Sequence, residues 1–398
     1  MVQSRIIVAG YISLDITPAF PESYKGRTLG EVILPGKLRK VGAVETSPGG
    51  CVTNTGMALH TLGADVSLVA KLGDDSFGSI VQEAYRKRGA RAEFIISNEV
   101  DTSYTVVIAV PGNDRCFLVN PGANDHFYET DFNLEKLTQA EYFHFGYPAL
   151  MESMYKDGGK ALASVLRSLQ EGGVLTSLDM AFPDPASDAG RVDWTLYLQT
   201  ILPYVDFFVP SIEELCFMLD RERFVRWQEK AVKNGSDICM DLSLEEDVKP
   251  LAKKALSLGC GAVLLKCGAA GMYLVTSDEA RMVSLGERRR AHALELGEKG
   301  NTSGEEAFTG IGWGGIDRFQ ESFKPDIIRS GTGAGDTAIA GFLYGLSHGC
   351  DPVTCMELAA GCGSMCITQY DTLSGLIPIP EVLKRIRGGW ELQHFILP

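Results

Sequence analysis

Short apolar runs alternate with stretches of helical periodicity along most of the chain. The runs have the length and apolar content of buried strands and lie at Ile6–Ala9, Val66–Ala70, Tyr142–Phe145, Val174–Asp179, Phe207–Val209 and Ala262–Lys266. Helices are predicted at Val52–Leu62, ended by Gly63, and at Phe77–Arg88, ended at Gly89. This order predicts an α/β fold in which helices cover a mostly parallel sheet.

Two regions interrupt this rhythm, at about residues 20–47 and 100–120. Both are rich in β-forming residues and glycine turns without a helical period, so they predict antiparallel strands of a small sheet or lid. Residues 220–248 and 286–325 read as insertions into a single domain that spans residues 1–398. The second insertion contains Gly297–Glu306, whose composition is typical of an exposed loop.

Composition narrows the classes of function. The net charge of −14 argues against a nucleic-acid surface, because nothing would neutralise phosphates along an extended track. The longest basic run, Arg288–Arg290, is followed by acidic residues and is read as a solvated turn or helix end. The ten cysteines include no C-x-x-C pair and no zinc spacing. Several of them lie in apolar stretches, so buried, reduced thiols and a cytoplasmic location are expected there: Cys51, Cys260, Cys267, Cys362 and Cys366. Neither a signal peptide nor a membrane-spanning run of roughly 18 apolar residues is recognisable, so we expect a soluble protein without a membrane partner.

The most informative segment is Ser330–Asp336, Ser-Gly-Thr-Gly-Ala-Gly-Asp, which runs into an apolar helix. Its glycines let backbone N–H groups face outward at the positive end of a helix dipole, which predicts an anion site. At the mouth of that site, Asp336 could take a proton from a hydroxyl that attacks a phosphate.

Two other interpretations of this segment are a plain turn into a helix and a dinucleotide fingerprint without its third glycine. The fingerprint would need a further strand and an acidic residue about 20 positions on. The chain contains no Walker loop, so phosphate binding has to come from a segment such as this one.

A second glycine motif lies at Pro48–Asn54. The paired Gly49 and Gly50 permit a ligand to approach the backbone, and Asn54 offers donors and an acceptor that suit sugar hydroxyls. A tight turn followed by a helix cap explains the same residues without a ligand. Asp15 follows the first predicted strand at its carboxyl end, where open α/β sheets bind ligands, although a plain turn residue is an equal interpretation.

Three weaker signals each have a structural explanation as well. Arg115 could reach a substrate from the lid, or it could be a charge that protects a strand edge. Ser211 and Glu214 fit a helix capping box, and the alternative places Glu214 near a hydrated Mg²⁺. Lys266 ends a strand, and the Gly268–Gly271 turn after it is either a plain turn or a shelf for a flat base.

Together and in this order, these motifs resemble the ribokinase-like (PfkB) family of carbohydrate kinases. The resemblance covers nearly the whole chain, and Gly333–Asp336 with its small apolar helix is the most specific part. The other matching segments are Asp15, Gly49–Asn54, Leu72–Gly78, Arg115 with Gly122–Asn124, Glu214, and Gly268–Gly271. The implied fold is a three-layer, doubly wound α/β domain with a mostly parallel sheet and a small β-rich lid that closes over the sugar.

The resemblance implies ATP-dependent phosphorylation of a primary hydroxyl on a sugar or sugar-like molecule, with Mg²⁺. It implies that Asp336 is the general base and that the N–H groups of Gly333, Ala334 and Gly335 hold the transferring phosphoryl group. The implied substrate ligands are Asp15, Gly49, Gly50, Asn54 and Arg115. The implied nucleotide site is lined by Lys266, Gly268, Gly271 and Thr332, with Glu214 near the metal through water.

Three departures limit what the resemblance implies. Ser330 and Gly331 stand where the family commonly has the Asp-Thr of a monovalent-cation site. A potassium requirement therefore does not carry over to this chain unless other oxygen atoms form the cation site. Ser211 replaces the asparagine of the family's N-x-x-E, which weakens the metal role of Glu214. An asparagine often found near the nucleotide is missing around Gly361–Gly363, so contacts to the base do not carry over there.

The sequence therefore predicts a cytoplasmic sugar kinase that uses ATP and Mg²⁺ and that could form a homodimer through its lid. One alternative is a nucleoside kinase of the same fold, whose pocket would need an aromatic wall such as Tyr11, Phe20 or Phe117. Another is a non-catalytic sugar- or nucleotide-binding relative. The motifs recognise hydroxyls in general, so they do not identify the substrate.

Overall fold

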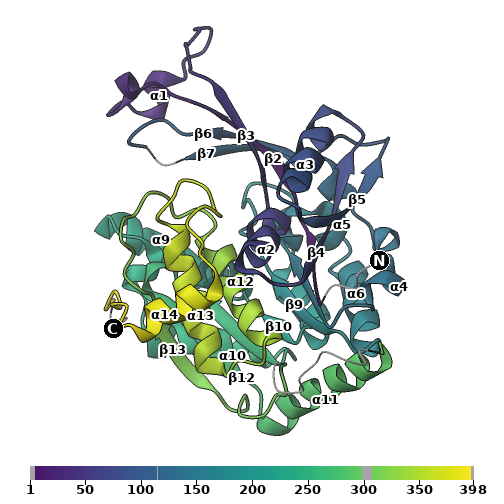
Figure 1. Cartoon of the computed structure of the whole chain (residues 1–398). Coiled ribbons are helices and arrows are strands. Elements are labelled where there is room, and N and C mark those ends of the chain that lie inside the picture. Colours follow the sequence, from purple (N-terminus) through teal and green to yellow (C-terminus); the bar gives the residue numbers. More distant parts are fainter. Residues whose placement is uncertain (1–4, 114, 298–306, 396–398) are drawn as a thin grey trace.

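The computed structural model describes residues 5–113, 115–297 and 307–395. A nine-stranded sheet in the order β13-β12-β11-β10-β9-β8-β1-β4-β5 forms the main body, and a four-stranded sheet, β3-β2-β6-β7, extends from it (Figure 1). The large sheet contains β1 (Ile6–Gly10), β4 (Val66–Gly73), β5 (Arg91–Ser97), β8 (Tyr142–Gly146), β9 (Leu175–Asp179), β10 (Phe207–Phe208), β11 (Ala262–Lys266), β12 (Gly271–Thr276) and β13 (Asp317–Glu321). The small sheet contains β2 (Ser13–Pro18), β3 (Val44–Gly49), β6 (Tyr104–Ile108) and β7 (Cys116–Asn120).

Parallel pairing aligns the carboxyl ends of the central strands. β1 pairs in parallel with β4 and β8, and β12 and β13 join antiparallel at one edge. Gly10 at the end of β1 pairs with Gly146 at the end of β8, which in turn pairs with Asp179 at the end of β9. The residues that follow these strands therefore emerge side by side at one edge of the sheet, where open α/β sheets bind ligands.

Helices cover both faces of the large sheet, which confirms the three-layer, doubly wound α/β fold (Figure 1). On one face α12 packs against α2 and α13, and on the other face α6, α7, α8 and α10 pack against one another and the strands. The principal helices are α2 (Ala58–Leu62), α3 (Ser76–Lys87), α6 (Lys160–Glu171), α7 (Trp194–Ile201), α8 (Ile212–Leu219), α9 (Arg221–Asn234), α10 (Lys249–Leu256), α11 (Glu279–Glu295), α12 (Ala334–Ser347), α13 (Pro352–Cys366) and α14 (Ile379–Arg387). The short ones are α1 (Leu29–Val32), α4 (Leu134–Leu137) and α5 (Glu152–Tyr155).

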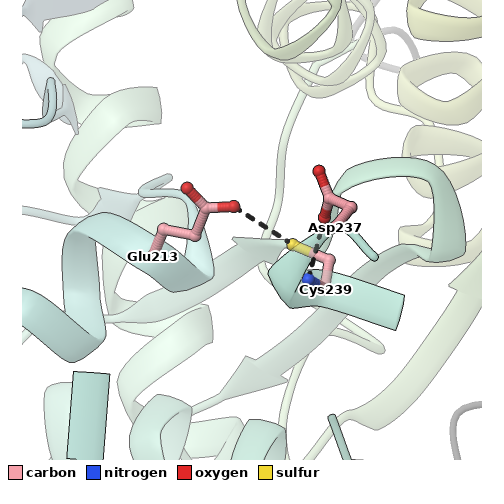
Figure 2. Close-up of side chains that lie close together, drawn as sticks. All are labelled: Glu213, Asp237 and Cys239. Atoms are coloured by element: carbon pink, nitrogen blue, oxygen red, sulfur yellow. Dashed lines mark hydrogen bonds between the residues drawn. The ribbon is translucent and has the colours of Figure 1, made fainter. Parts of the chain in front are cut away.

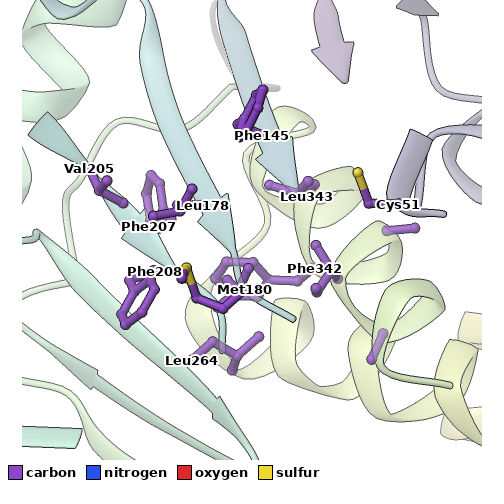
Figure 3. Packing of buried hydrophobic residues seen from close by; sticks show 14 of the residues in the cluster. Cys51, Phe145, Leu178, Met180, Val205, Phe207, Phe208, Leu264, Phe342 and Leu343 are labelled. Carbon is purple, nitrogen blue, oxygen red and sulfur yellow. The ribbon is translucent and has the colours of Figure 1, made fainter. Parts of the chain in front are cut away.

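The core fixes α12 to the sheet. Phe342 and Leu343 of α12 face Phe207 and Leu178 of the central strands (Figure 3). The rings of Phe207 and Phe342 meet edge to face with centroids 6.1 Å apart, and both side chains are fully buried. Burial of one such side chain contributes about 1.5–3 kcal/mol, so the packing holds the amino-terminal end of α12 in a defined position over the strand ends.

Most of the predicted strands over residues 20–47 are absent. This range contains a short turn, η1 (Glu22–Tyr24), and the helix α1, and its extended part begins only at Val44. The small sheet takes its additional strand from Ser13–Pro18 instead, and β2 pairs with β6 in parallel rather than antiparallel. The prediction failed because the glycine-rich, polar sequence of this range resembles that of strands joined by turns. Most of the range nevertheless forms no hydrogen-bonded ladder between strands.

The range 286–325 was also only partly predicted. Asp317–Glu321 is not an elaboration but the edge strand β13 of the large sheet, and the predicted loop Gly297–Glu306 lies, apart from Gly297, outside the described residues. Residues 220–248 form α9 and two further turns, η8 (Ile238–Asp241) and η9 (Leu244–Val248).

The solvated role predicted for Arg288–Arg290 is wrong for two of its residues. Arg288 pairs with the buried Asp206, and Arg289, itself buried, pairs with the buried Glu141. These pairs fasten α11 to the amino-terminal ends of the strands.

All ten cysteines are free thiols, and the five in apolar stretches are buried as predicted, whereas Cys116 and Cys350 are only partly buried. Among the described residues, no helix is long and apolar enough to cross a membrane.

Candidate active site

A buried carboxylate lies at the first turn of α12. Asp336 is 6% exposed, and three side chains donate hydrogen bonds to it. Asn54 donates its amide to Oδ2 at 3.2 Å, Thr55 donates its hydroxyl to Oδ1 at 3.2 Å, and the Tyr147 hydroxyl lies 2.7 Å from both oxygens. Segments that are far apart in the sequence therefore converge on one carboxylate.

Burial raises the pKa of Asp336, because desolvation disfavours the charged form. The hydrogen bonds from Tyr147, Asn54 and Thr55 and the positive charge of Lys266 oppose that rise. This arrangement suits a proton acceptor, because the carboxylate is shielded from water but its charged form is supported by donors.

The loop in front of Asp336 is formed as the glycine motif predicts. Gly333 precedes α12 with φ of +80°, in the left-handed region that glycine adopts without strain. The Ala334 N–H donates to the Gly331 carbonyl at 3.3 Å, and the N–H groups of Gly335 and Asp336 lie at the positive end of the helix without an acceptor inside it. The loop also touches the small sheet, since Arg115 donates to the Thr332 hydroxyl at 3.4 Å. The segment has the geometry of an anion site.

A buried ion pair lies next to this loop. The Lys266 ammonium at the end of β11 lies 2.7 Å from Oδ1 of Asp179 at the end of β9. A Cβ atom placed on Gly335 would be 3.5 Å from Cε of Lys266, so the lysine side chain adjoins the first turn of α12. Burial opposes the charge on Lys266, but the carboxylates of Asp179 and Glu214 outweigh it and raise the pKa of the ammonium. Burial raises the pKa of Asp179, and Lys266 opposes that change.

The second glycine motif lies at the junction of the two sheets. A Cβ atom on Gly49 would lie 2.5 Å from Oδ2 of Asp15, and one on Gly50 would lie 2.6 Å from the Tyr11 carbonyl oxygen. Both glycines are therefore required for close packing. Asp15 is not in a turn but in β2, and burial raises its pKa while hydrogen bonds from Ser13 and Thr105 oppose the rise.

The helix predicted over Val52–Leu62 begins with a wider π-helical turn, η2 (Val52–Met57), which continues into α2. Asn54 and Thr55 are consecutive residues of this turn, and both reach Asp336. Asn54 is fixed from its other side, because Thr372 donates to its Oδ1 at 3.2 Å. Such π-helical turns occur frequently at functional sites.

The glycine turn after Lys266 lies apart from Asp336. Gly268 begins the short turn η10 (Gly268–Ala270), and Gly271 opens β12. Figure 2 shows Glu213, Asp237 and Cys239 close together, and Cβ and Sγ of Cys239 would each be 3.2 Å from a Cβ atom on Gly268. The Cys239 thiol donates to Glu213 at 3.6 Å and its N–H donates to Asp237 at 2.8 Å, so these groups satisfy one another.

Glu214 occupies the capping box that the sequence allowed. Its Oε2 accepts from the Ser211 N–H at 2.7 Å, and its own N–H donates to the Ser211 hydroxyl. The charge of Glu214 nevertheless contributes to raising the pKa values of both Lys266 and Asp179. A capping role and proximity to the site are therefore compatible.

The predicted residues form two groups. Asp336 and Asn54 are hydrogen-bonded and Lys266 adjoins the same helical turn, whereas Asp15, Gly49 and Gly50 lie together at the junction of the two sheets. Of the three aromatic residues that could form a wall, Phe20 packs against Tyr24 and Phe117 is 52% exposed, whereas Tyr11 is buried beside Tyr147.

Sequence reasoning missed three residues. Thr55 follows a predicted ligand, and Asp179 ends a predicted strand, so the rule that selected Asp15 could also have selected Asp179. Tyr147 carried no recognisable signal.

Comparisons with known proteins identify the family of this chain. The model of the family described as pfkB family carbohydrate kinase matches residues 20–285 and 317–379. Fructokinase-2 of Oryza sativa subsp. japonica is 28% identical over 187 residues, which cover 46% of this chain and 54% of that protein. The match therefore spans about half of the fructokinase. An uncharacterized sugar kinase of Archaeoglobus fulgidus is 21% identical over 320 residues, which cover 80% of this chain and 98% of that protein.

Solved structures share the fold. The ribokinase of Arabidopsis thaliana, complexed with ribose and ATP, has a TM-score of 0.67 and 18% identity over 96% of this chain and 98% of that one. A putative ribokinase II from E. coli, in complex with ATP and Mg²⁺, has a TM-score of 0.66 and 16% identity over 97% of this chain and 99% of that one. Because the family model covers most of the chain and the fold is that of the ribokinases, this protein belongs to the pfkB family of carbohydrate kinases.

Proposed function

We propose that this protein is an ATP-dependent kinase that transfers the γ-phosphoryl group to a primary hydroxyl of a sugar or sugar-like substrate, with Asp336 as the general base. The observation that carries the proposal is the buried Asp336 carboxylate at the amino-terminal turn of α12, directly after a glycine loop. A carboxylate beside an anion site is unfavourable in isolation, and its three donors stabilise it there.

In this mechanism the acceptor hydroxyl transfers its proton to Asp336 as its oxygen bonds to the γ-phosphorus. The bond from that phosphorus to the β,γ-bridging oxygen breaks, and ADP leaves. The N–H groups of Gly333, Ala334 and Gly335 and the Lys266 ammonium stabilise the charge on the transferring group. Thr332, Gly268 and Gly271 line the rest of the nucleotide site.

The charges around Lys266 fit a divalent cation. Three carboxyl groups, those of Asp179, Glu214 and Asp336, act on this single ammonium. Asp179 and Glu214 offer the oxygen ligands that Mg²⁺ prefers, and they would hold it through water. When bound, Mg²⁺ neutralises phosphate charge. We extend no potassium requirement to this chain, because Ser330 and Gly331 replace the family's Asp-Thr.

The proposed sugar site is the floor formed by Asp15, Gly49, Gly50 and Asn54. Carboxylate and amide groups can bind several hydroxyls at once. Arg115 approaches from the small sheet, which we propose acts as a lid that excludes water during transfer. Its hydrogen bond to Thr332 joins the small sheet to the phosphate loop.

The lid also offers a surface for a homodimer. Phe117, Leu118 and Val119 of β7 are 52%, 59% and 53% exposed, and β7 forms one edge of the small sheet. Exposed apolar side chains on an unpaired edge strand favour pairing with a second copy. Light scattering after size exclusion should give a dimer, and Leu118→Lys should give a monomer.

The test of the proposed activity is a screen for ADP formation with unphosphorylated and phosphorylated sugars, sugar acids and nucleosides. Turnover with a sugar or sugar acid supports the proposal. Turnover with nucleosides alone would identify a nucleoside kinase of the same fold. ATP and sugar binding without any turnover across the panel would identify a non-catalytic relative.

A further inference from the structure

Tyr147 occupies an unusual place beside the proposed base. It follows β8 directly, and its hydroxyl lies 2.7 Å from both carboxylate oxygens of Asp336. Its ring lies beside that of Tyr11, with centroids 6.2 Å apart, at the junction of the two sheets. The phenol therefore reaches the carboxylate from the sheet, whereas Asn54 and Thr55 reach it from η2.

The backbone of Tyr147 is strained. Its φ is +67°, and among the described residues the other non-glycine residue with positive φ is His394 near the chain end. A bulky residue persists in this conformation only where its surroundings impose it, and such outliers cluster at functional sites. Here the Tyr147 N–H donates to the Asp179 carbonyl at 3.3 Å, and Pro148 begins the next turn, η5 (Pro148–Leu150). The conformation is the one that aims the phenol at Asp336.

The hydrogen bonds fix the rotation of the Asp336 side chain. Thr55 donates to Oδ1, Asn54 donates to Oδ2, and the Tyr147 hydroxyl is equidistant from both oxygens. A carboxylate offers about four lone-pair directions, and the one phenolic hydrogen fills only one of them at a time, so these three donors leave room for one more hydroxyl. If Tyr147 were absent, only the two weaker contacts at 3.2 Å would orient the carboxylate.

We propose that Tyr147 is a positioning residue, whose hydroxyl orients the Asp336 carboxylate and keeps it ionised in its buried site so that it can accept the proton of the sugar hydroxyl. The catalytic part of this inference rests on the proposed function. Its electrostatic part, the support of a charged Asp336, holds whether or not a sugar is phosphorylated.

The charged and titratable groups that face Asp336 come from several elements. They are Lys266 of β11, Asp179 of β9, Tyr147 after β8, Cys51 before η2 and Cys366 at the end of α13. Lys266 favours the charged carboxylate and Asp179 disfavours it. Burial raises the pKa of Asp336, and the hydrogen bond from Tyr147 is the first of the contacts that oppose this rise. Removal of the phenolic hydroxyl should therefore raise the pKa further.

The test is Tyr147→Phe, which keeps the ring and removes only the hydroxyl. The matched control is Tyr197→Phe, because Tyr197 of α7 is also buried and its hydroxyl has no partner among the described residues. Circular dichroism verifies that both variants fold. With an accepted sugar, Tyr147→Phe should lower kcat about ten-fold and leave the KM for the sugar within about two-fold. The acid limb of its kcat–pH profile should move to higher pH, whereas Tyr197→Phe should match the wild type.

A second measurement does not depend on activity. Protein labelled with ¹³C at aspartate carboxyl carbons is titrated by NMR, and the Asp336 signal is identified by its loss in Asp336→Asn. The Asp336 pKa should be higher in Tyr147→Phe than in the wild type and in Tyr197→Phe. An unchanged Asp336 titration in Tyr147→Phe overturns the inference, as does a loss of kcat without a displaced acid limb. If the wild type phosphorylates no acceptor, the proposed function fails while the titration still decides the role of Tyr147.

Discussion

The buried pair of Lys266 and Asp179 offers a test that separates stability from catalysis. The charged atoms are 2.7 Å apart, and the two side chains are 12% and 3% exposed. At an effective dielectric constant of about 20, their attraction amounts to about 6 kcal/mol, which desolvation offsets in part. Lys266→Met leaves Asp179 buried without its partner, and the loss of one partner of a buried pair costs about 3–5 kcal/mol.

This destabilisation converts into a measurable fall in melting temperature. An unfolding entropy of about 2.1 cal/mol/K per residue gives roughly 0.8 kcal/mol/K for this chain, so Tm should fall by about 4–6 °C. The loss should be smallest at low pH, where Asp179 is protonated and needs no cationic partner, and should increase as pH rises and the buried carboxyl, whose pKa is raised by burial, ionises without Lys266. The double variant Lys266→Met/Asp179→Asn should recover most of the stability and lose this pH dependence.

Catalysis should not recover with stability. Lys266 adjoins the first turn of α12, so both Lys266→Met and the double variant should show a kcat/KM for ATP at least about ten-fold below that of the wild type. The assay combines thermal unfolding by calorimetry with ADP release. A single variant as stable as the wild type would refute the buried-pair reasoning, and a double variant with restored kcat/KM would refute the role of Lys266 at the phosphate.

Two further substitutions probe the sugar side. Gly50→Ala should lower Tm and weaken sugar binding measured by calorimetry, because φ is +84° and the new Cβ would lie 2.6 Å from the Tyr11 carbonyl oxygen. Gly63→Ala, at φ +95° with open space around it, is the control for backbone strain, and an equal effect of both substitutions would contradict the steric argument. Arg115→Gln should raise the KM for the sugar several-fold without a change in Tm, since its contact to Thr332 is a single exposed hydrogen bond. An unchanged KM would contradict a substrate role for Arg115.

The sequence was most informative where function lies in contiguous residues. The loop before Asp336 and the paired Gly49 and Gly50 were recognisable because each motif combines glycines with a polar side chain at a predicted helix start. The strands were recognisable because buried parallel strands are uniformly apolar. Tyr147 was not, because its role depends on strand register and a strained backbone, neither of which leaves a pattern in one chain.

Long-range pairing explains the remaining errors. Arg288 and Arg289 looked solvated next to acidic neighbours, but Glu141 and Asp206 lie far away in the sequence and were not available to a local pattern. Asp15 was predicted as a ligand or a turn residue after the first strand, but it lies in β2, whose ladder in the small sheet is formed with segments far away in the sequence.

The central claim is that Asp336 accepts the proton of the attacking hydroxyl. Its most direct test is Asp336→Asn, measured by steady-state turnover together with calorimetric binding of sugar and of ATP. Asparagine keeps the shape of the side chain but cannot act as the base, so kcat should fall by about 10²–10⁴-fold while both dissociation constants stay close to those of the wild type. Turnover within a few-fold of the wild type would contradict the claim.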